Sequence, residues 1–92
     1  MIKNNIFIHP DSKILKSTVI EPFSYIDSNV EIGKNCWVAN NVTIYSGARI
    51  GNNVKIGGGS GVVNDIPDNN QVMGYPAVPL KDFIKQRKKI NE

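Results

Sequence analysis

A six-residue repeat runs through most of this 92-residue chain and restricts its fold more than any other feature. A β-branched aliphatic residue recurs at every sixth position, ten times without a gap. Two places before each aliphatic, a second column holds mostly small side chains. Because side chains alternate across a strand, residues two apart share a face, so both columns are expected to point inward. The aliphatic column is Ile8, Ile14, Ile20, Ile26, Ile32, Val38, Ile44, Ile50, Ile56 and Val62.

A third column, three places after the aliphatic, predicts the corners between the strands. It holds only asparagine or glycine over six consecutive repeats, and these residues tolerate left-handed backbone at little cost. Short strands with sharp corners build a triangular coil from three hexads. The pattern therefore predicts an all-β solenoid, a parallel β-helix of about three coils. The corner column is Asn29, Asn35, Asn41, Gly47, Asn53 and Gly59.

The outward positions of neighbouring coils, eighteen residues apart, predict three different faces. One face stacks Lys13, Glu31 and Arg49 into an alternating ladder of charge. The other two carry apolar and aromatic side chains, which on so small a body favour a subunit interface. A few coils alone bury little surface, so the sequence predicts a homotrimer. The other two stacks are Val19, Trp37 and Lys55, and Phe7, Tyr25 and Thr43.

The period stops after Val62, which divides the chain into three parts. Residues 1–65 are expected to form the β-helix, residues 66–79 an extended exit loop, and residues 80–92 a short C-terminal helix. Pro79 suits the first turn of a helix. Leu80, Phe83 and Ile84 recur at helical spacing and would form one apolar face, with most of the lysines on the other faces. The helix is therefore predicted to be basic and amphipathic.

The charge of the chain is concentrated at its C-terminal end. Residues 1–78 hold equal numbers of acidic and basic side chains, and the net +3 lies in residues 79–92. A basic tail on a neutral body predicts an acidic partner. Nucleic acid is not expected, because no aromatic residues interleave the basic ones. No apolar run reaches the ~20 residues of a transmembrane segment and no signal peptide is evident, so the expected location is cytoplasmic.

The repeat resembles the left-handed parallel β-helix of the hexapeptide-repeat acyltransferases. Residues 8–10 (IHP), 19–23 (VIEPF) and 30–33 (VEIG) look like opening coils of the acyltransferases that start lipid A synthesis. Residues 58–67 (GGSGVVNDIP) and 74–79 (GYPAVP), followed by a basic helix, are similar to the C-terminal end of the UDP-3-O-acylglucosamine N-acyltransferases. This chain looks strongly truncated beside them. The resemblance implies a left-handed trimer that uses a carrier-protein or coenzyme A thioester and a sugar-nucleotide acceptor.

The same resemblance implies where the donor would bind. Glycine-rich last coils and the Gly-Tyr-Pro-Ala segment line the pantetheine groove in this family, which carries over to Gly59, Gly74, Tyr75, Pro76 and Ala77. The basic helix would dock an acyl carrier protein, whose acidic surface it complements. The docking residues are Lys81, Lys85, Arg87 and Lys88. No motif calls for a bound cofactor or a metal ion, and the single Cys36 excludes an internal disulfide.

The catalytic histidine of that family, which lies in a middle coil, has no counterpart here. His9 is the only histidine, and the stacking predicts Asp27 one coil away on the same edge, with Tyr45 beyond. A carboxylate beside His9 would suit it to general base catalysis. The favoured interpretation is a residue that caps the open edge of the first coil. Two functions therefore stay open, an acyltransferase of lipid A synthesis, active or not, and a non-catalytic trimeric scaffold that binds acyl carrier protein.

Overall fold

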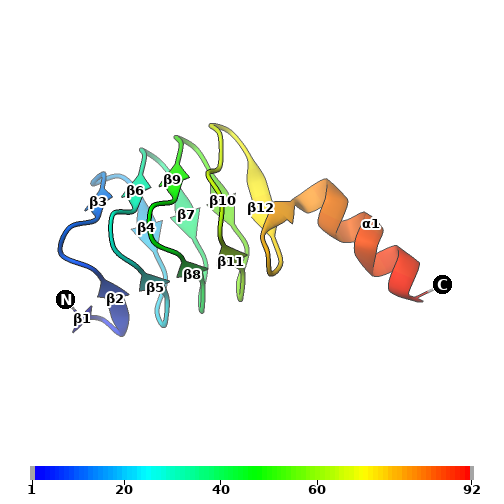
Figure 1. Cartoon of the computed structure of the whole chain (residues 1–92), viewed down its shortest axis with the longest axis horizontal. Coiled ribbons are helices and arrows are strands. Elements are labelled where there is room, and N and C mark those ends of the chain that lie inside the picture. The colour runs from blue at the N-terminus through cyan, green and yellow to red at the C-terminus, as the bar shows by residue number, and fades with distance from the viewer. Residues whose placement is uncertain (1, 92) are drawn as a thin grey trace.

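The computed structural model describes residues 2–91, and it confirms the solenoid (Figure 1). The chain winds as a left-handed parallel β-helix of about four turns, followed by one short helix. The first strands are β1 (Ile2–Lys3), β2 (Ile6–Ile8), β3 (Lys13–Ile14), β4 (Val19–Ile20), β5 (Tyr25–Ile26) and β6 (Glu31–Ile32). They are followed by β7 (Trp37–Val38), β8 (Thr43–Ile44), β9 (Arg49–Ile50), β10 (Lys55–Ile56), β11 (Gly61–Val62), β12 (Gln71–Met73) and β13 (Val78–Pro79), and then by α1 (Leu80–Asn91).

Both inward columns form the core, as the repeat predicts. From Ile26 to Val62 every aliphatic of the column is at most 4% exposed. The small column is buried beside it, from Ser24 to Ser60. Burying side chains of this size contributes about 1.5–3 kcal/mol each relative to leaving them exposed, so this column is the main source of stability. The first coil differs, because Ile8, Ile14 and Ile20 are only partly buried.

The corners take the left-handed conformation that the third column predicts. All six of its asparagines and glycines have φ between 56° and 81°. Phe23 stands at the equivalent position of the first coil and is also left-handed, with φ of 67°. A bulky side chain is uncommon in this region of backbone space. Its ring is 64% exposed, so the corner places an aromatic group in solvent.

Three sheets form the faces, and from β2 to β11 paired residues on parallel strands are eighteen positions apart. One contains β1-β2-β5-β8-β11, another β13-β12-β10-β7-β4, and the third β3-β6-β9. On the third face Lys13, Glu31 and Arg49 are direct neighbours, as expected. Within residues 2–91, however, these three side chains form no ion pair. The three charged residues are therefore stacked in register but are not joined by salt bridges.

The first part of the segment 66–79, expected as an extended loop, adds parallel pairs to the solenoid, whereas β13 folds back antiparallel to β12. Ile66 pairs with Ile50 in a parallel bridge, and Val72 pairs with Ile56. These pairs are sixteen residues apart rather than eighteen, because the corner after Val62 is two residues shorter. The inward spacing of six then resumes at Ile66 and Val72, a signal that counting in sixes from Ile8 misses. Asp65 Oδ1 accepts the Arg49 N–H at 2.8 Å and fastens the shortened corner.

The C-terminal end is closed by β12, β13 and α1. β13 pairs antiparallel to β12, and α1 makes its main contacts with these two strands. The helix leaves the solenoid at the end opposite to β1 (Figure 1). Within the described residues, no helix is long and apolar enough to cross a membrane.

Candidate functional site

The fourth coil folds the Gly-Tyr-Pro-Ala segment onto β11. The Gly61 N–H donates to the Gly74 carbonyl at 3.0 Å, and the Ala77 N–H donates to the Gly61 carbonyl at 2.8 Å. Gly61 must be a glycine here, since a β-carbon would overlap the ring of Tyr75. The sequence places glycine where the two backbones approach closely. The segment is thus held as a cap on the glycine-rich end of the solenoid.

Two further contacts fix the start of this cap. The Gly74 N–H donates to Ser60 Oγ at 3.2 Å, and that hydroxyl donates to the Gly57 carbonyl at 2.6 Å. Tyr75 packs edge-on against Tyr45, with ring centroids 6.0 Å apart. The ring of Tyr75 is nevertheless 63% exposed, so it is available to a ligand.

A cavity of about 200 Å³ lies between the cap and α1. Gly74, Tyr75 and Pro76 line it from the cap, so the structure brings together three of the five residues predicted for donor binding. Arg87, predicted for carrier-protein docking, lines the same cavity from α1. A space below the ~300–1,000 Å³ of sites that enclose a whole small molecule suits a narrow, linear group. Val78, Phe83 and Gln86 complete the lining.

The other predicted donor and carrier residues lie outside this cavity. Gly59 stands at an open corner with φ of 73°. Ala77 packs against the core instead. Lys81, Lys85 and Lys88 are exposed along α1. Among the basic side chains of α1 that the structure describes, Arg87 alone lines the cavity with the cap.

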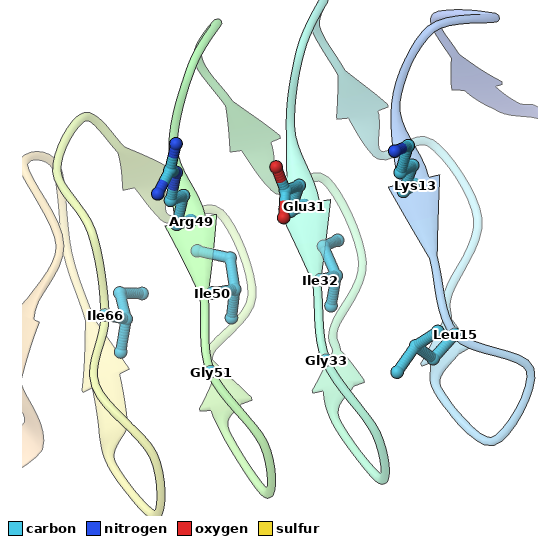
Figure 2. Close-up of a pocket in the computed structure, with 9 residues that line it drawn as sticks. All are labelled: Lys13, Leu15, Glu31, Ile32, Gly33, Arg49, Ile50, Gly51 and Ile66. Carbon is cyan, nitrogen blue, oxygen red and sulfur yellow. The ribbon is translucent and has the colours of Figure 1, made fainter.

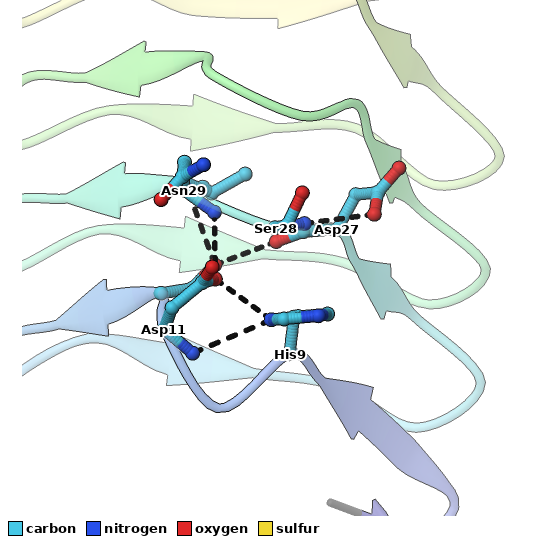
Figure 3. Close-up of polar contacts among 7 residues, drawn as sticks. His9, Asp11, Asp27, Ser28 and Asn29 are labelled. Carbon is cyan, nitrogen blue, oxygen red and sulfur yellow. Dashed lines mark hydrogen bonds and ion pairs between the residues drawn. The ribbon is translucent and has the colours of Figure 1, made fainter.

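His9 pairs with a carboxylate, but not with the one that the stacking predicts. Its Nδ1 lies 2.7 Å from Asp11 Oδ1 (Figure 3). Asp27 is one coil away as expected, yet its carboxylate accepts the N–H of Ser28 at 2.8 Å. The expectation of a His9–Asp27 pair is thus wrong, because the corner after His9 turns Asp11 back toward the imidazole. The His-x-Asp spacing around this corner was the signal that could have identified the partner.

Asp11 is itself held by the next coil. Its Oδ1 accepts the N–H of Asn29 at 2.8 Å. This bond, with a smaller contribution from His9, keeps the pKa of Asp11 below its ordinary value. Nδ1 of His9 also accepts the backbone N–H of Asp11 at 3.4 Å, so both the carboxylate and the amide of Asp11 contact this nitrogen. Asp11 thus holds the imidazole of His9 from its Nδ1 side.

His9 and the C-terminal cap lie at opposite ends of one face. β2 and β11 are the ends of the run β2-β5-β8-β11, so three strand spacings, or about 14 Å, separate His9 from Gly61. Asp27 and Tyr45 occupy the same edge between them. The structure therefore does not bring the candidate base to the predicted donor site within one chain.

A cavity of about 400 Å³, which was not predicted, lies on the charged face (Figure 2). Gly33 and Gly51 line the cavity at the edge of this face. A β-carbon at Gly33 would overlap the side-chain oxygen of Asn52, and one at Gly51 would overlap that of Asp68. Lys13, Glu31 and Arg49 stand along it on successive strands. The mixture of both charge signs on an apolar floor points to no particular ligand.

Comparisons with known proteins find one family model that is similar to part of the repeat. Residues 29–64 match the model of the bacterial transferase hexapeptide (six repeats) family. A search of curated proteins gives no match. The match supports the hexapeptide-repeat resemblance, whereas the particular link to UDP-3-O-acylglucosamine N-acyltransferase stays a prediction.

Solved structures share the fold. The acetyltransferase domain of PglB from Neisseria gonorrhoeae FA1090 superposes with a TM-score of 0.63 at 21% identity, over 84% of this chain and 58% of that one. The same domain in complex with acetyl coenzyme A gives 0.62 at the same identity and coverage. PerB from Caulobacter crescentus, in complex with CoA and GDP-perosamine, gives 0.56 at 18% identity, over 85% and 55%. This chain thus spans little more than half the length of these structures.

Proposed function

We propose that the chain, whose coils from residue 29 to residue 64 match the hexapeptide transferase family, is an acyltransferase. It would move an acyl group from a coenzyme A or carrier-protein thioester to the amino or hydroxyl group of a nucleotide-linked sugar. The observation that carries the proposal is the narrow cavity between the Gly-Tyr-Pro-Ala cap and Arg87. The fold supports it, since the similar PglB domain is solved with acetyl coenzyme A and PerB with CoA and GDP-perosamine.

The cavity has the chemistry that a phosphopantetheine arm requires. That arm is thin and extended, carries amides along its length and ends in a phosphate. Arg87 would take the phosphate, because its guanidinium matches phosphate oxygens in two-pronged geometry. The exposed ring of Tyr75 would cover the apolar stretches of the arm. Lys81, Lys85 and Lys88 would add attraction for an acidic carrier protein.

Transfer also needs a group that takes a proton from the acceptor. The acceptor nitrogen or oxygen attacks the thioester carbonyl, the carbon–sulfur bond breaks, the thiolate leaves, and the acceptor proton passes to a base. His9 is our candidate, because Asp11 orients its ring from the Nδ1 side. Nε2 would then accept the proton of the acceptor. The distance from His9 to the cap requires the donor arm to run along the edge that carries Tyr45 and Asp27.

The acceptor and the assembly follow the sequence resemblance. UDP-3-O-acylglucosamine, an intermediate of lipid A synthesis, is the acceptor that residues 58–67 and 74–79 imply. The exposed apolar faces support the homotrimer, since Val19 and Trp37 are 52% and 44% exposed and Phe7 stacks on Tyr25 at 4.8 Å. A trimer would bury these side chains between subunits.

A second function, a non-catalytic scaffold for acyl carrier protein, rests on a different observation. Lys81, Lys85 and Lys88 are exposed on α1. α1 forms one end of the molecule and β2, which His9 follows, lies toward the other end (Figure 1). A protein that only binds the carrier needs the helix and not the base. The two functions differ in whether a thioester is consumed.

Thiol release tests the proposal. The purified chain would be mixed with acyl-coenzyme A or acyl carrier protein and a panel of nucleotide-linked amino sugars. We expect acceptor-dependent release that His9→Gln lowers by at least ~10²-fold, the usual contribution of a general base. Coenzyme A binding would be followed by calorimetry in parallel.

Two neighbouring glycines provide a matched pair for the donor site. Gly61→Ala forces the Tyr75 ring to move, whereas at Gly58 a β-carbon meets its nearest neighbour at an ordinary 3.5 Å. Gly61→Ala should weaken coenzyme A binding and Gly58→Ala should not. No release with any acceptor, together with intact binding of carrier protein, would reject the enzyme in favour of the scaffold.

A further inference from the structure

The corner between β4 and β5 carries an aromatic ring, which the coils stacked after it lack. Phe23 stands there, and the equivalent residues of the next two coils are Asn41 and Gly59. All three are left-handed, with φ of 67°, 59° and 73°. Asparagine and glycine adopt this conformation at little cost, whereas a phenylalanine is strained by it. The turn itself therefore does not require the side chain of Phe23.

The neighbouring coils fix the backbone at this corner without help from the ring. The Phe23 N–H donates to the Asn5 carbonyl at 2.6 Å, and the Asn41 N–H donates to the Pro22 carbonyl at 3.3 Å. The ring of Phe23 is 64% exposed and forms no ring contact within the described residues. Strained residues cluster at functional sites, so the ring is expected to contact something outside its own chain.

Phe23 lies on the edge between the two apolar faces. β4 belongs to the sheet that contains β7 and β10, and β5 belongs to the sheet that contains β2 and β8. The outward residues on either side of the corner are Val19 and Tyr25, which are 52% and 43% exposed. Glu21 accepts the indole N–H of Trp37 at 3.3 Å and is thus turned toward the face of β7. We call Val19, Phe23 and Tyr25 the aromatic edge.

We infer that the three copies of Phe23 meet on the threefold axis of the homotrimer and form the centre of the subunit contact. The inference rests on the proposed homotrimer. In a ring of identical subunits, one face of each subunit packs on a different face of the next. A triangular coil that uses two adjoining faces in this way turns their common edge toward the axis. Neighbouring coils diverge away from the axis, so the contact is closest at the aromatic edge. Aromatic residues at the centre of a contact are typically those that contribute most to association.

The distribution of charge favours this edge over the other two. A residue on a threefold axis meets its own copies, so a charged side chain there would be repelled. On the aromatic edge, the corner residues and those directly before them are uncharged from residue 22 to residue 59. The edge that follows β2 has Asp11 at its first corner, and the remaining edge has Lys16 and Lys34 directly before its corners. The aromatic edge is therefore the one that can face its own copies without repulsion.

Phe23→Asn tests the inference, because it gives this corner the residue that Asn41 provides in the next coil. Each trimer would lose three rings at its centre. Sedimentation of the full chain over a range of concentrations should therefore show trimer formation weakened by at least ~10²-fold. Leu15→Asn is the matched control, since Leu15 is 48% exposed but lies at the edge of the charged face. It should leave the mass unchanged.

The same substitution should stabilise a chain that is already separated from its copies. Val19→Asp places a carboxylate on an apolar face and should separate the subunits. In that background, Phe23→Asn should raise the midpoint of thermal unfolding by roughly 4 °C or more, because the left-handed corner no longer strains a phenylalanine. If Phe23 only supported the fold of its own chain, the midpoint would fall instead.

Thiol cross-linking locates the axis independently of these variants. Cys36 is buried, so a short bismaleimide should join pairs of chains through Phe23→Cys and none through Leu15→Cys. Cross-links through Leu15→Cys alone would place a different edge on the axis.

The sedimentation results separate this inference from the homotrimer on which it rests. A trimer that Phe23→Asn leaves intact while Val19→Asp separates it would overturn the axial position of Phe23 and keep the homotrimer. A wild-type mass of one chain would overturn both. Dissociation by Phe23→Asn, together with a lower midpoint in the Val19→Asp background, would indicate a role within the single chain and would also overturn the inference.

Discussion

Asp11 connects the first coil to the second through one carboxylate. The same oxygen, Oδ1, accepts the Asn29 N–H and lies 2.7 Å from Nδ1 of His9. The six-residue column could predict that Asn29 turns the chain, because the turn depends on that residue alone. It could not predict the His9–Asp11 pair, since their contact depends on how one corner bends and not on the stacking of coils. Site geometry of this kind is decided by local backbone shape.

Replacement of Asp11 should change how stability depends on pH. Because the folded-state pKa of Asp11 is lowered, its contribution is present above about pH 4, the ordinary value, and is lost as the pH falls further. In Asp11→Asn the amide oxygen can still accept the Asn29 N–H, but the charge is gone. We therefore expect wild type to exceed Asp11→Asn in free energy of unfolding at pH 7, and the difference to shrink below pH 4.

Urea titrations at several pH values would measure this difference. Glu31→Gln is the control, because it removes an exposed carboxylate that forms no ion pair in residues 2–91. A difference between wild type and Asp11→Asn that stays constant from pH 7 to pH 3 would contradict the assignment.

In the last coil, the six-residue repeat alone does not predict the strands that form. Ile66 and Val72 fill the core like their predecessors, but the corner before them is two residues shorter. Because two residues are missing from this corner, the later inward positions no longer fall at multiples of six from Ile8. Counting in sixes therefore makes the repeat end at Val62. The residues that hold the shortened corner, such as Asp65 on Arg49, act through side-chain to backbone bonds that no hydrophobic column records. The helix was predictable because its apolar stripe has a period of its own.

α1 should depend on Phe83 for its place on the cap. The Phe83 ring lies against Gly74, and a helix of 12 residues is at the lower limit of what persists unaided in water. Phe83→Ala should therefore unseat α1 at a cost of about 1–2 kcal/mol, less than for a fully buried ring because Phe83 is half-buried. Circular dichroism at 222 nm should show the lost helix, while the thermal unfolding of the solenoid changes little.

Ile84→Ala is the matched control, since Ile84 is 47% exposed on the same helix. It should keep the helical signal. Equal loss of signal in the two variants would mean that α1 is held by something other than the contact of Phe83 with the cap.

At the scale of the whole molecule, the sequence predicts which faces of the solenoid carry apolar side chains and which face carries charged ones. It does not predict how subunits contact one another. Stacking every eighteenth residue separated the charged face from the two aromatic ones, and the structure has those registers. Contacts between chains depend on surface shape, which a repeat of inward residues does not encode. The homotrimer therefore rests on the exposure of Val19, Trp37 and Tyr25.

Val19→Asp tests the homotrimer directly. Val19 neighbours Trp37 in register, so a carboxylate there would be buried unpaired if this face lies between subunits. We expect the trimer to dissociate, with a loss of at least ~10²-fold in affinity, about 3 kcal/mol. Sedimentation would report the mass, and the emission of Trp37, the only tryptophan, should shift to longer wavelength as water reaches the ring.

Lys13→Asp makes the corresponding change on the charged face and should leave both mass and emission unchanged. If Val19→Asp stays assembled while Lys13→Asp dissociates, the charged face with its 400 Å³ hollow is the interface, and the aromatic faces are open to ligands instead.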